Sequence, residues 1–189
     1  MSKLIYSLLF LLCGGILFAQ TYTNESLLMV KPYLQFSTQT SMHVLWETHE
    51  AASTAVFFGE ARYGVRKAVL DQNMILEGNR LMHEVELSGL KPETNYFWQI
   101  SSVTESGDSI LSPVYTFKTA VKDSSAFMFA LIGDTQRNNE TPWAWEKIAP
   151  RVWSDRPNFA VLAGDLVDKG MEKEDWLDEF FPQGHVLMS

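Results

Sequence analysis

The pattern of apolar residues changes once along this chain of 189 residues, and that change limits the folds available to it. From residue 31 to about residue 120, apolar and polar residues alternate in short runs between turn residues, which is typical of antiparallel strands buried on one face. Further on, residues 126–132 and 158–163 form two continuous apolar runs. Continuous runs are typical of parallel strands that are buried on both faces. The sequence therefore predicts an all-β sandwich followed by an α/β segment.

The alternation in the first region also predicts which side chains face its core. Trp46 is the expected core anchor, on one strand face with Met42 and Val44. The next strand leaves two registers open, because either Phe57 or Phe58 can face inward.

A corner between two of these strands carries a recognisable pattern. Residues 87–96 read Leu-Ser-Gly-Leu-Lys-Pro-Glu-Thr-Asn-Tyr. This pattern resembles the corner of fibronectin type III domains, in which a tyrosine ring lies in the core while its hydroxyl reaches back to the upstream backbone. We expect residues 25–120 to form a domain of this kind.

The second region reads as a strand, a helix and a strand. Thr141 is suited to cap the helix, with Pro142 in its first position. The helix is predicted to carry an apolar stripe from Trp145 to Val152 and to stop at residues 155–157. A further helix is expected over residues 172–181, with its acidic side chains on a solvated face.

Each apolar run of the second region ends in Gly-Asp, which places Asp134 after the first run and Asp165 after the second. The carboxyl ends of parallel strands meet at one edge of a sheet, so the two carboxylates are expected to lie together. Two carboxylates at one place can hold, and one of them can bridge, divalent or trivalent metal ions. Gly-Asp is also common in ordinary turns, which is the structural alternative.

These residues resemble the start of the calcineurin-like metallophosphoesterase pattern, and with the preceding sandwich the layout resembles the purple-acid-phosphatase-like branch. The resemblance implies that Asp134 ligates a first metal ion and that Asp165 bridges two. Gln136 stands at the family's histidine position, where its carbonyl oxygen can still coordinate. Asp168 stands where purple acid phosphatases have an iron-binding tyrosine, and it is expected to orient a later ligand. Iron, zinc and manganese all remain open as the metals.

The family's Gly-Asn-His motif and later histidines do not follow Asp168 in this sequence. The resemblance implies hydrolysis of phosphate esters by a metal-bound hydroxide, but no catalytic residue is assigned here. We expect this chain to be a fragment of such an enzyme, by truncation or frameshift. Residues 126–189 are then an incomplete domain with an uncovered sheet, inactive alone and doubtful as a metal binder. Two alternatives are a non-enzymatic binding module with a vestigial tail, and complementation by another chain.

The four histidines of the chain do not suggest a replacement for the missing motif. His185 is expected in a surface loop after the last helix. The other three fall in the sandwich and are expected at the surface or in strands; they are His43, His49 and His83.

The first 19 residues have the layout of a signal peptide, with Lys3 followed by an apolar run and then Ala19. The run is interrupted by glycines and shorter than a membrane anchor, and Leu12 before Cys13 argues against lipid attachment. An exported protein, secreted or periplasmic, is therefore predicted. The net charge of −8 disfavours nucleic acid as a surface-bound partner and leaves a phosphate ester as the implied substrate.

Overall fold

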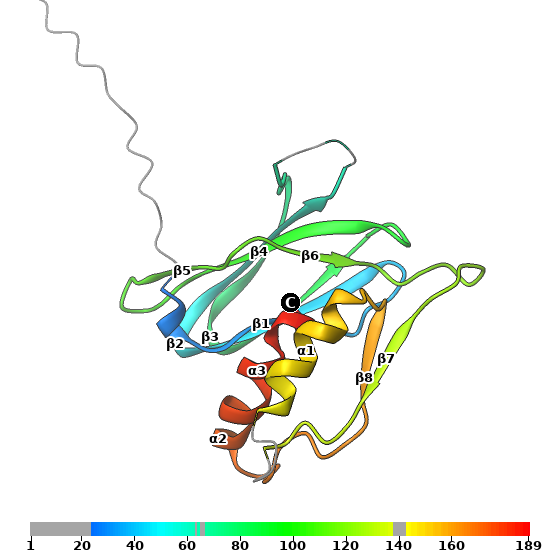
Figure 1. Ribbon diagram of the computed structural model, residues 1–189. Coiled ribbons are helices and arrows are strands. Elements are labelled where there is room, and N and C mark those ends of the chain that lie inside the picture. Colours follow the sequence, from blue (N-terminus) through cyan, green and yellow to red (C-terminus); the bar gives the residue numbers. More distant parts are fainter. Residues whose placement is uncertain (1–23, 63, 65–66, 138–142) are drawn as a thin grey trace, which may run out of the picture.

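The computed structural model describes residues 24–62, 64, 67–137 and 143–189; the predicted leader, residues 1–19, lies outside them. The described part contains a six-stranded antiparallel sheet, a two-stranded parallel sheet and a small set of helices (Figure 1). In chain order the elements are η1 (Glu25–Leu27), β1 (Leu28–Gln35), β2 (Ser41–Glu60), β3 (Gln72–Ser88), β4 (Asn95–Val103), β5 (Ser109–Leu111), β6 (Tyr115–Lys118), β7 (Phe129–Ile132), α1 (Ala144–Ser154), β8 (Phe159–Leu162), α2 (Lys173–Asp175), the π-helix η2 (Trp176–Phe180) and α3 (Phe181–Met188).

The two long strands β2 and β3 bend and so take part in both layers of a β-sandwich. Their halves Ser41–Glu47 and Met82–Ser88 pair with each other, and β1 pairs with the first of them. After a register shift between Glu47 and Ala52, the other half of β2 pairs with β3 on one side and with β4 on the other. Strands β5 and β6 extend β4. The predicted all-β sandwich is confirmed.

The core of the sandwich lies between these layers. Trp46 and Trp98 are fully buried, which confirms Trp46 as the expected anchor. The open register of β2 is decided in favour of Phe58, which is 4% exposed, while Phe57 is only partly buried. Val56 and Phe58 therefore lie beside Ile100 and Trp98 of the paired strand β4, in one continuous apolar cluster.

The corner before β4 has the tyrosine geometry that its sequence pattern predicts. The ring of Tyr96 is buried, and its hydroxyl oxygen accepts the backbone N–H of Lys91 at 2.9 Å. Thr119 closes the same corner, because its hydroxyl donates to the carbonyl oxygen of Lys91 at 2.7 Å. Backbone groups that would otherwise be unpaired at this turn are thus satisfied.

The second region contains the predicted strand, helix and strand. β7 and β8 pair in parallel from Phe129–Phe159 to Ile132–Leu162, and α1 connects them and ends at Ser154 as expected. The helix begins at Ala144 with Trp143 at its N-cap; the predicted capping residues 141 and 142 lie outside the described residues. Trp145 and Ala149 are buried, but Ile148 is 46% exposed.

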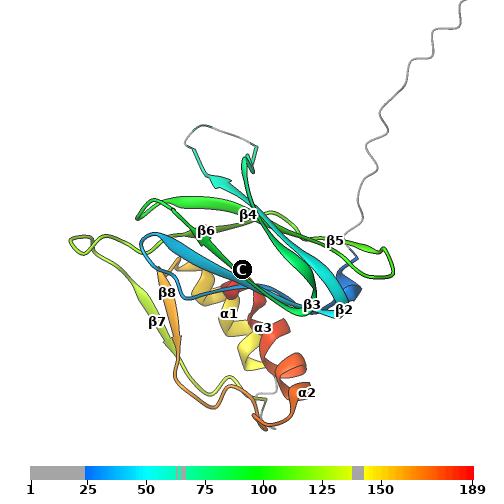
Figure 2. The ribbon, with the colours of Figure 1, turned by 180° about the vertical axis from the view of Figure 1, so that it is seen from behind.

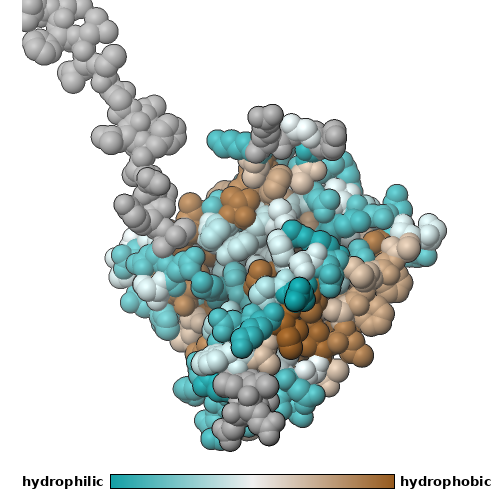
Figure 3. Space-filling model, viewed as in Figure 1, coloured by the Kyte–Doolittle hydropathy of each residue, from teal (hydrophilic) through white to brown (hydrophobic). Residues whose placement is uncertain are grey.

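The prediction that β7 and β8 are buried on both faces is wrong. Their paired side chains on one face are between 41% and 68% exposed, and the strands are only four residues long. This exposure agrees with the expectation of an uncovered sheet. Figure 3 shows hydrophobic side chains gathered on the side of the molecule where β7 and β8 lie. The exposed side chains are Phe127, Phe129, Leu131, Phe159 and Val161.

The last helix extends further than predicted, through α3 to Met188. Pro182 has no N–H to donate four residues back, and the side-chain amide of Gln183 instead donates to the carbonyl oxygen of Asp178 at 3.0 Å. The backbone adopts a π-helical turn just before this proline and then continues as α3. The sequence Pro-Gln-Gly at residues 182–184, expected to be a loop, is therefore helical.

Helix α3 lies against the sandwich on one side and against α1 on the other (Figures 1 and 2). The outer face of β1 and β2 is covered in this way, which explains why Leu45 is buried although it points away from the sandwich core. Lys173 forms an ion pair with Glu47 across the same contact. None of the described helices is long and apolar enough to span a membrane. The apolar contact joins Val30, Tyr33 and Leu45 to Leu177, Phe181 and Met188.

Candidate metal site at the ends of β7 and β8

The loops that follow β7 and β8 are joined by hydrogen bonds between their backbones. The N–H of Asp134 donates to the carbonyl oxygen of Gly164 at 3.2 Å, and the N–H of Gln136 donates to that of Asp165 at 3.1 Å. The hydroxyl of Thr135, which is buried between the loops, donates to the carbonyl oxygen of Leu166 at 2.9 Å. The parallel sheet therefore brings Asp134, Gln136 and Asp165 to one edge.

Both aspartates have the left-handed backbone conformation, which side chains other than glycine rarely adopt. Their φ angles are 53° at Asp134 and 49° at Asp165. Such conformations cost free energy and are concentrated at functional sites. Gly164 has a φ of 108°, so a side chain there would be strained, whereas Gly133 is not in this region. Only the second loop therefore requires a glycine before its aspartate.

Gln136 presents a buried side-chain oxygen that has no hydrogen-bond partner among the described residues. A buried polar atom without a partner is uncommon and calls for a ligand or a specific role. The side chains of Asp134 and Asp165, in the same paired loops, are exposed. Carboxylate and amide oxygens suit hard cations, so these three residues fit a metal ion chemically. Within the described residues, no three His, Cys, Asp or Glu side chains are grouped closely enough to hold a metal.

Asp168 is also exposed, and its side chain has no described hydrogen bond to the other three predicted residues. It borders a cavity of about 390 Å³ together with Asp165. Asp168 is therefore close to the candidate site without being joined to it directly. The cavity is lined by Asp165, Leu166, Val167, Asp168, Gly170 and Trp176.

The acidic face of the last helix, predicted to be solvated, contacts the site loops. One carboxylate oxygen of Glu179 accepts the backbone N–H groups of Arg137 at 3.1 Å and Asp168 at 3.0 Å. Asp175 accepts the N–H of Lys169 at 2.9 Å. Sequence reasoning missed Glu179. Its spacing of four from Asp175 indicates a shared helix face, but nothing local indicates what that face meets.

The prediction of a surface loop for His185 is wrong, because this residue lies in α3 and is partly buried. Its Nε2 is 3.1 Å from the carbonyl oxygen of Pro32, an acceptor, so Nε2 carries a proton. Burial, with a smaller contribution from the positive charge of Lys31, lowers the pKa of His185. This histidine is engaged with the sandwich and not with the aspartates.

His83 is in a strand, as expected, but is fully buried and not at the surface. Its ring stacks on Trp46 with centroids 4.5 Å apart, and its nitrogens lie 2.7 Å and 3.2 Å from the hydroxyls of Thr54 and Thr48. Burial, and then the charge of Arg80, lower the pKa of His83 to about 4. His43 and His49 are in β2, the former beside Glu84.

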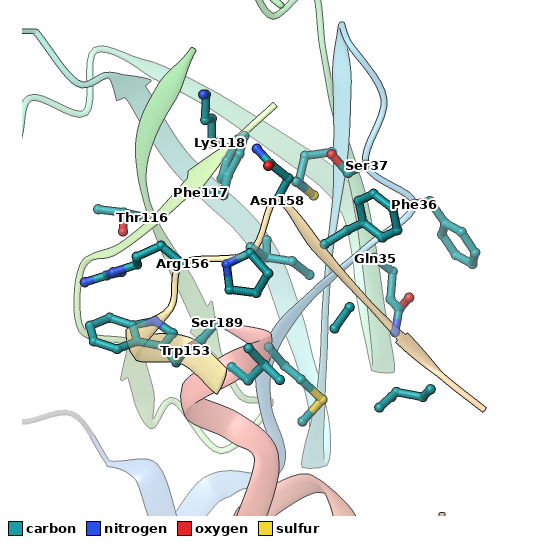
Figure 4. A pocket seen from close by; sticks show the side chains of 18 of the residues that line it. Gln35, Phe36, Ser37, Thr116, Phe117, Lys118, Trp153, Arg156, Asn158 and Ser189 are labelled. Atoms are coloured by element: carbon teal, nitrogen blue, oxygen red, sulfur yellow. The ribbon is translucent and has the colours of Figure 1, made fainter. Parts of the chain in front are cut away.

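A second cavity, of about 610 Å³, lies between the sandwich, α1 and β8 and contains none of the predicted site residues. Figure 4 shows that its labelled lining comes from both regions, with Phe36 and Lys118 on the sandwich side and Trp153 and Arg156 on the other. The guanidinium of Arg156 stacks on Trp153, 3.4 Å from the ring centroid.

The fold and the site together define a fibronectin-III-like sandwich followed by a short α/β unit with two carboxylates at the strand ends. Residues 29–119 match the family model described as "Purple acid Phosphatase, N-terminal domain". The chain therefore carries an N-terminal domain of the purple acid phosphatase type. No curated protein matches the chain significantly.

Three matches to solved structures differ in how much of this chain they cover. Purple acid phosphatase PPD1 from yellow lupin (Lupinus luteus) seeds matches with a TM-score of 0.63 and 17% identity, over 83% of this chain and 33% of the lupin chain. The structure of PhoD matches with a TM-score of 0.49 and 16% identity, over 73% of this chain and 27% of the PhoD chain. The third fibronectin III domain of human KIAA0343 protein matches with a TM-score of 0.39 and 17% identity, over 59% of this chain and 98% of that domain's chain.

The chain spans about a third of the length of the lupin enzyme.

Proposed function

We propose that this chain supplies the first part of a metal-dependent phosphoesterase site, which acts on phosphate esters once its remaining ligands are present. Asp134 and Gln136 would bind a first metal ion, and Asp165 would bridge it to a second. The observation that carries the proposal is the backbone pairing of the two loops that hold Asp134 and Asp165, one of which also holds the unpartnered side-chain oxygen of Gln136. The similarity to a purple acid phosphatase domain supports the same chemistry.

In this proposal each of the four residues has its own role at the metal site. Asp134 and Asp165 would repel each other, and a cation between them relieves that repulsion. Gln136 would add a neutral oxygen ligand to the first metal ion without adding charge. Bound metal ions would polarise the phosphate ester and activate a water molecule. Asp168, at the rim of the neighbouring cavity, would orient a ligand through a hydrogen bond.

The described residues provide no histidine to this site. His185 is held at Pro32, and His43, His49 and His83 lie in the sandwich strands. A group that protonates the leaving oxygen and the further metal ligands would therefore come from residues other than these. We expect the 189-residue chain to bind a metal ion weakly and to hydrolyse no phosphate ester by itself.

Residues 1–19 would direct export and be removed, which would also remove Cys13, the one cysteine of the sequence. N-terminal sequencing of the protein recovered from the extracellular or periplasmic fraction is expected to begin near Gln20. Recovery of the uncleaved chain in the cytoplasm would contradict this part of the proposal.

The central experiment measures Mn²⁺ binding by electron paramagnetic resonance. Asp134→Asn and Asp165→Asn are each expected to weaken binding about tenfold or more, since each removes a charged ligand. Asp155→Asn, at the far end of α1, is the matched control and should leave the affinity unchanged. An assay with p-nitrophenyl phosphate is expected to show no turnover.

Equal Mn²⁺ affinity in the wild type and both aspartate variants would overturn the proposal. The chain would then be better described as an exported, non-enzymatic sandwich module.

A further inference from the structure

Glu179 is the point at which the last helix touches both loops of the candidate site. Its Oε2 atom accepts two backbone N–H groups, one from Arg137 at 3.1 Å and one from Asp168 at 3.0 Å. Arg137 directly follows Gln136, and Asp168 ends the loop that begins with Asp165. Hydrogen bonds to a carboxylate are roughly twice as strong as those between neutral groups. One side chain therefore ties together the two loops that carry the predicted ligands.

The position of Glu179 is fixed by contacts outside the site. It lies in the π-helical turn η2, next to Phe180, which is buried against Trp145 of α1. The indole N–H of Trp145 donates to the carbonyl oxygen of Phe180 at 3.2 Å. Two residues before Glu179, Leu177 packs on the apolar patch of β1 and β2. The carboxylate is thus presented to the loops by a helix that is held between α1 and the sandwich.

A π-helical turn inserts an extra residue into a helix and changes where the side chains around it point, and such turns are frequent at functional sites. Here it lies directly before Pro182, whose missing N–H releases the carbonyl oxygen of Asp178. The neighbouring Asp178 contacts the guanidinium of Arg137, so that two successive acidic side chains meet the same loop. The π-helical turn and Pro182 therefore lie in the same short segment as Asp178 and Glu179, the two side chains that contact the loops.

We propose that Glu179 is a positioning residue for the metal site: by holding the backbone of Arg137 and of Asp168, it fixes the loops in the arrangement in which Gln136 and Asp165 reach the same ion. This inference rests on the proposed function. It also makes the sandwich a part of the site's support, because the helix that carries Glu179 is seated on β1 and β2.

The test compares three substitutions of Glu179 with Glu174→Gln, an exposed acidic residue of α2 that serves as the matched control. Mn²⁺ affinity is measured by electron paramagnetic resonance, and hydrogen exchange of the Arg137 and Asp168 amides by NMR. Loss of an outer partner of a metal ligand typically lowers affinity about 10-fold to 100-fold.

Glu179→Ala is expected to weaken Mn²⁺ binding at least about tenfold and to speed exchange of both amides. Glu179→Gln keeps an acceptor oxygen and should restore both values most of the way. Glu179→Asp draws the carboxylate back by one methylene group while keeping the charge, so it should behave like Glu179→Ala. It also supplies a folded variant if the alanine substitution fails to fold.

Two results would overturn the inference separately. If the wild type binds Mn²⁺ and Glu179→Ala and Glu179→Asp bind it equally well, Glu179 does not position the site, although the proposed function stands. If the wild type binds no Mn²⁺, the proposed function fails and the positioning role fails with it.

Discussion

The sandwich and the α/β segment differ in how completely they bury their apolar side chains. In the sandwich, two sheet layers enclose Trp46, Trp98 and their neighbours completely, and the corner at Tyr96 closes its own hydrogen bonds. In the α/β segment, only Ile132 and Leu162 of the two-stranded sheet pack against the apolar cluster around Trp145, while the other face exposes residues such as Leu131 at 68%. The segment gains its remaining cover from the sandwich through α3.

The difference indicates a division of roles between the two regions. The sandwich has a closed core, whereas both left-handed aspartates are in the open region; Phe36 and Glu93 of the sandwich share that backbone conformation, and Trp98 Nε1 in its core is also without a partner. Strain and unsatisfied polar groups persist only where surrounding structure compensates for them.

The comparison predicts that a core substitution in the sandwich destabilises the whole protein, whereas one in the α/β segment unfolds that segment alone. Trp46→Ala should destabilise the whole protein by about 3–5 kcal/mol, because it empties the centre of the sandwich. Trp145→Ala should unfold the α/β segment while the sandwich stays folded, since Trp145 belongs to a separate apolar cluster. Urea unfolding followed by near-ultraviolet circular dichroism and by NMR would distinguish the two. Complete unfolding of the sandwich in Trp145→Ala would show that the regions form one cooperative unit.

A second prediction concerns how the free energy of unfolding depends on pH. His83 is held neutral in the sandwich with its pKa lowered to about 4, against 6.5 in the unfolded chain. The unfolded state therefore binds more protons between these values, and the free energy of unfolding should fall as the pH drops from about 6.5 to 4. The loss from this one group is about 3 kcal/mol at most, at about 1.4 kcal/mol for each pKa unit.

Urea unfolding at a series of pH values would measure this slope. His83→Gln should remove its share of the slope, whatever its effect on stability at neutral pH. An unchanged slope in His83→Gln would contradict the assignment.

A third prediction tests the packing of α3 on α1. A Cβ atom at Gly184 would lie 2.5 to 2.7 Å from indole atoms of Trp145, far inside normal contact. Gly184→Ala should therefore cost about 1–3 kcal/mol, although alanine is intrinsically the better helix former. Gly170→Ala, where the added atom meets nothing within 4 Å, is the control. Thermal unfolding that is unaltered or raised in Gly184→Ala would mean that the two helices do not pack so closely.

The smallest effect is expected at the ion pair between Lys173 of α2 and Glu47 of β2, which joins the two regions. Partly exposed pairs contribute about 0–1 kcal/mol and are weakened by salt. A double-mutant cycle with Lys173→Gln and Glu47→Gln should give a coupling free energy below about 1 kcal/mol that decreases at high ionic strength. A coupling that grows with salt would argue for an apolar contact in place of an ionic one.

Much of the fold follows from local sequence patterns. Alternation identified the strands and the inward face around Trp46, and the corner pattern identified the hydrogen bond of Tyr96. The continuous runs identified the parallel strands, and the two Gly-Asp pairs placed Asp134 and Asp165 at one edge. Their role as metal ligands remains a prediction. These features depend on neighbours in sequence or on simple sheet topology.

Other features could not be predicted in this way. Leu45 points away from the sandwich core, yet it is buried because α3 covers it. Pro-Gln-Gly at 182–184 has the composition of a loop, but the packing of Gly184 on Trp145 and the bond from Gln183 keep it helical. Tertiary contacts here outweigh local preference.

The sequence by itself thus determined the change from alternating to continuous apolar runs, the corner at Tyr96 and the meeting of the two aspartates. Only the tertiary structure decided that Glu179 binds the loops beside Gln136 and Asp168, and that the helix carrying it rests on the sandwich. The physical reason is that a local pattern reports which face of an element is apolar or charged. It does not report which distant surface that face will meet.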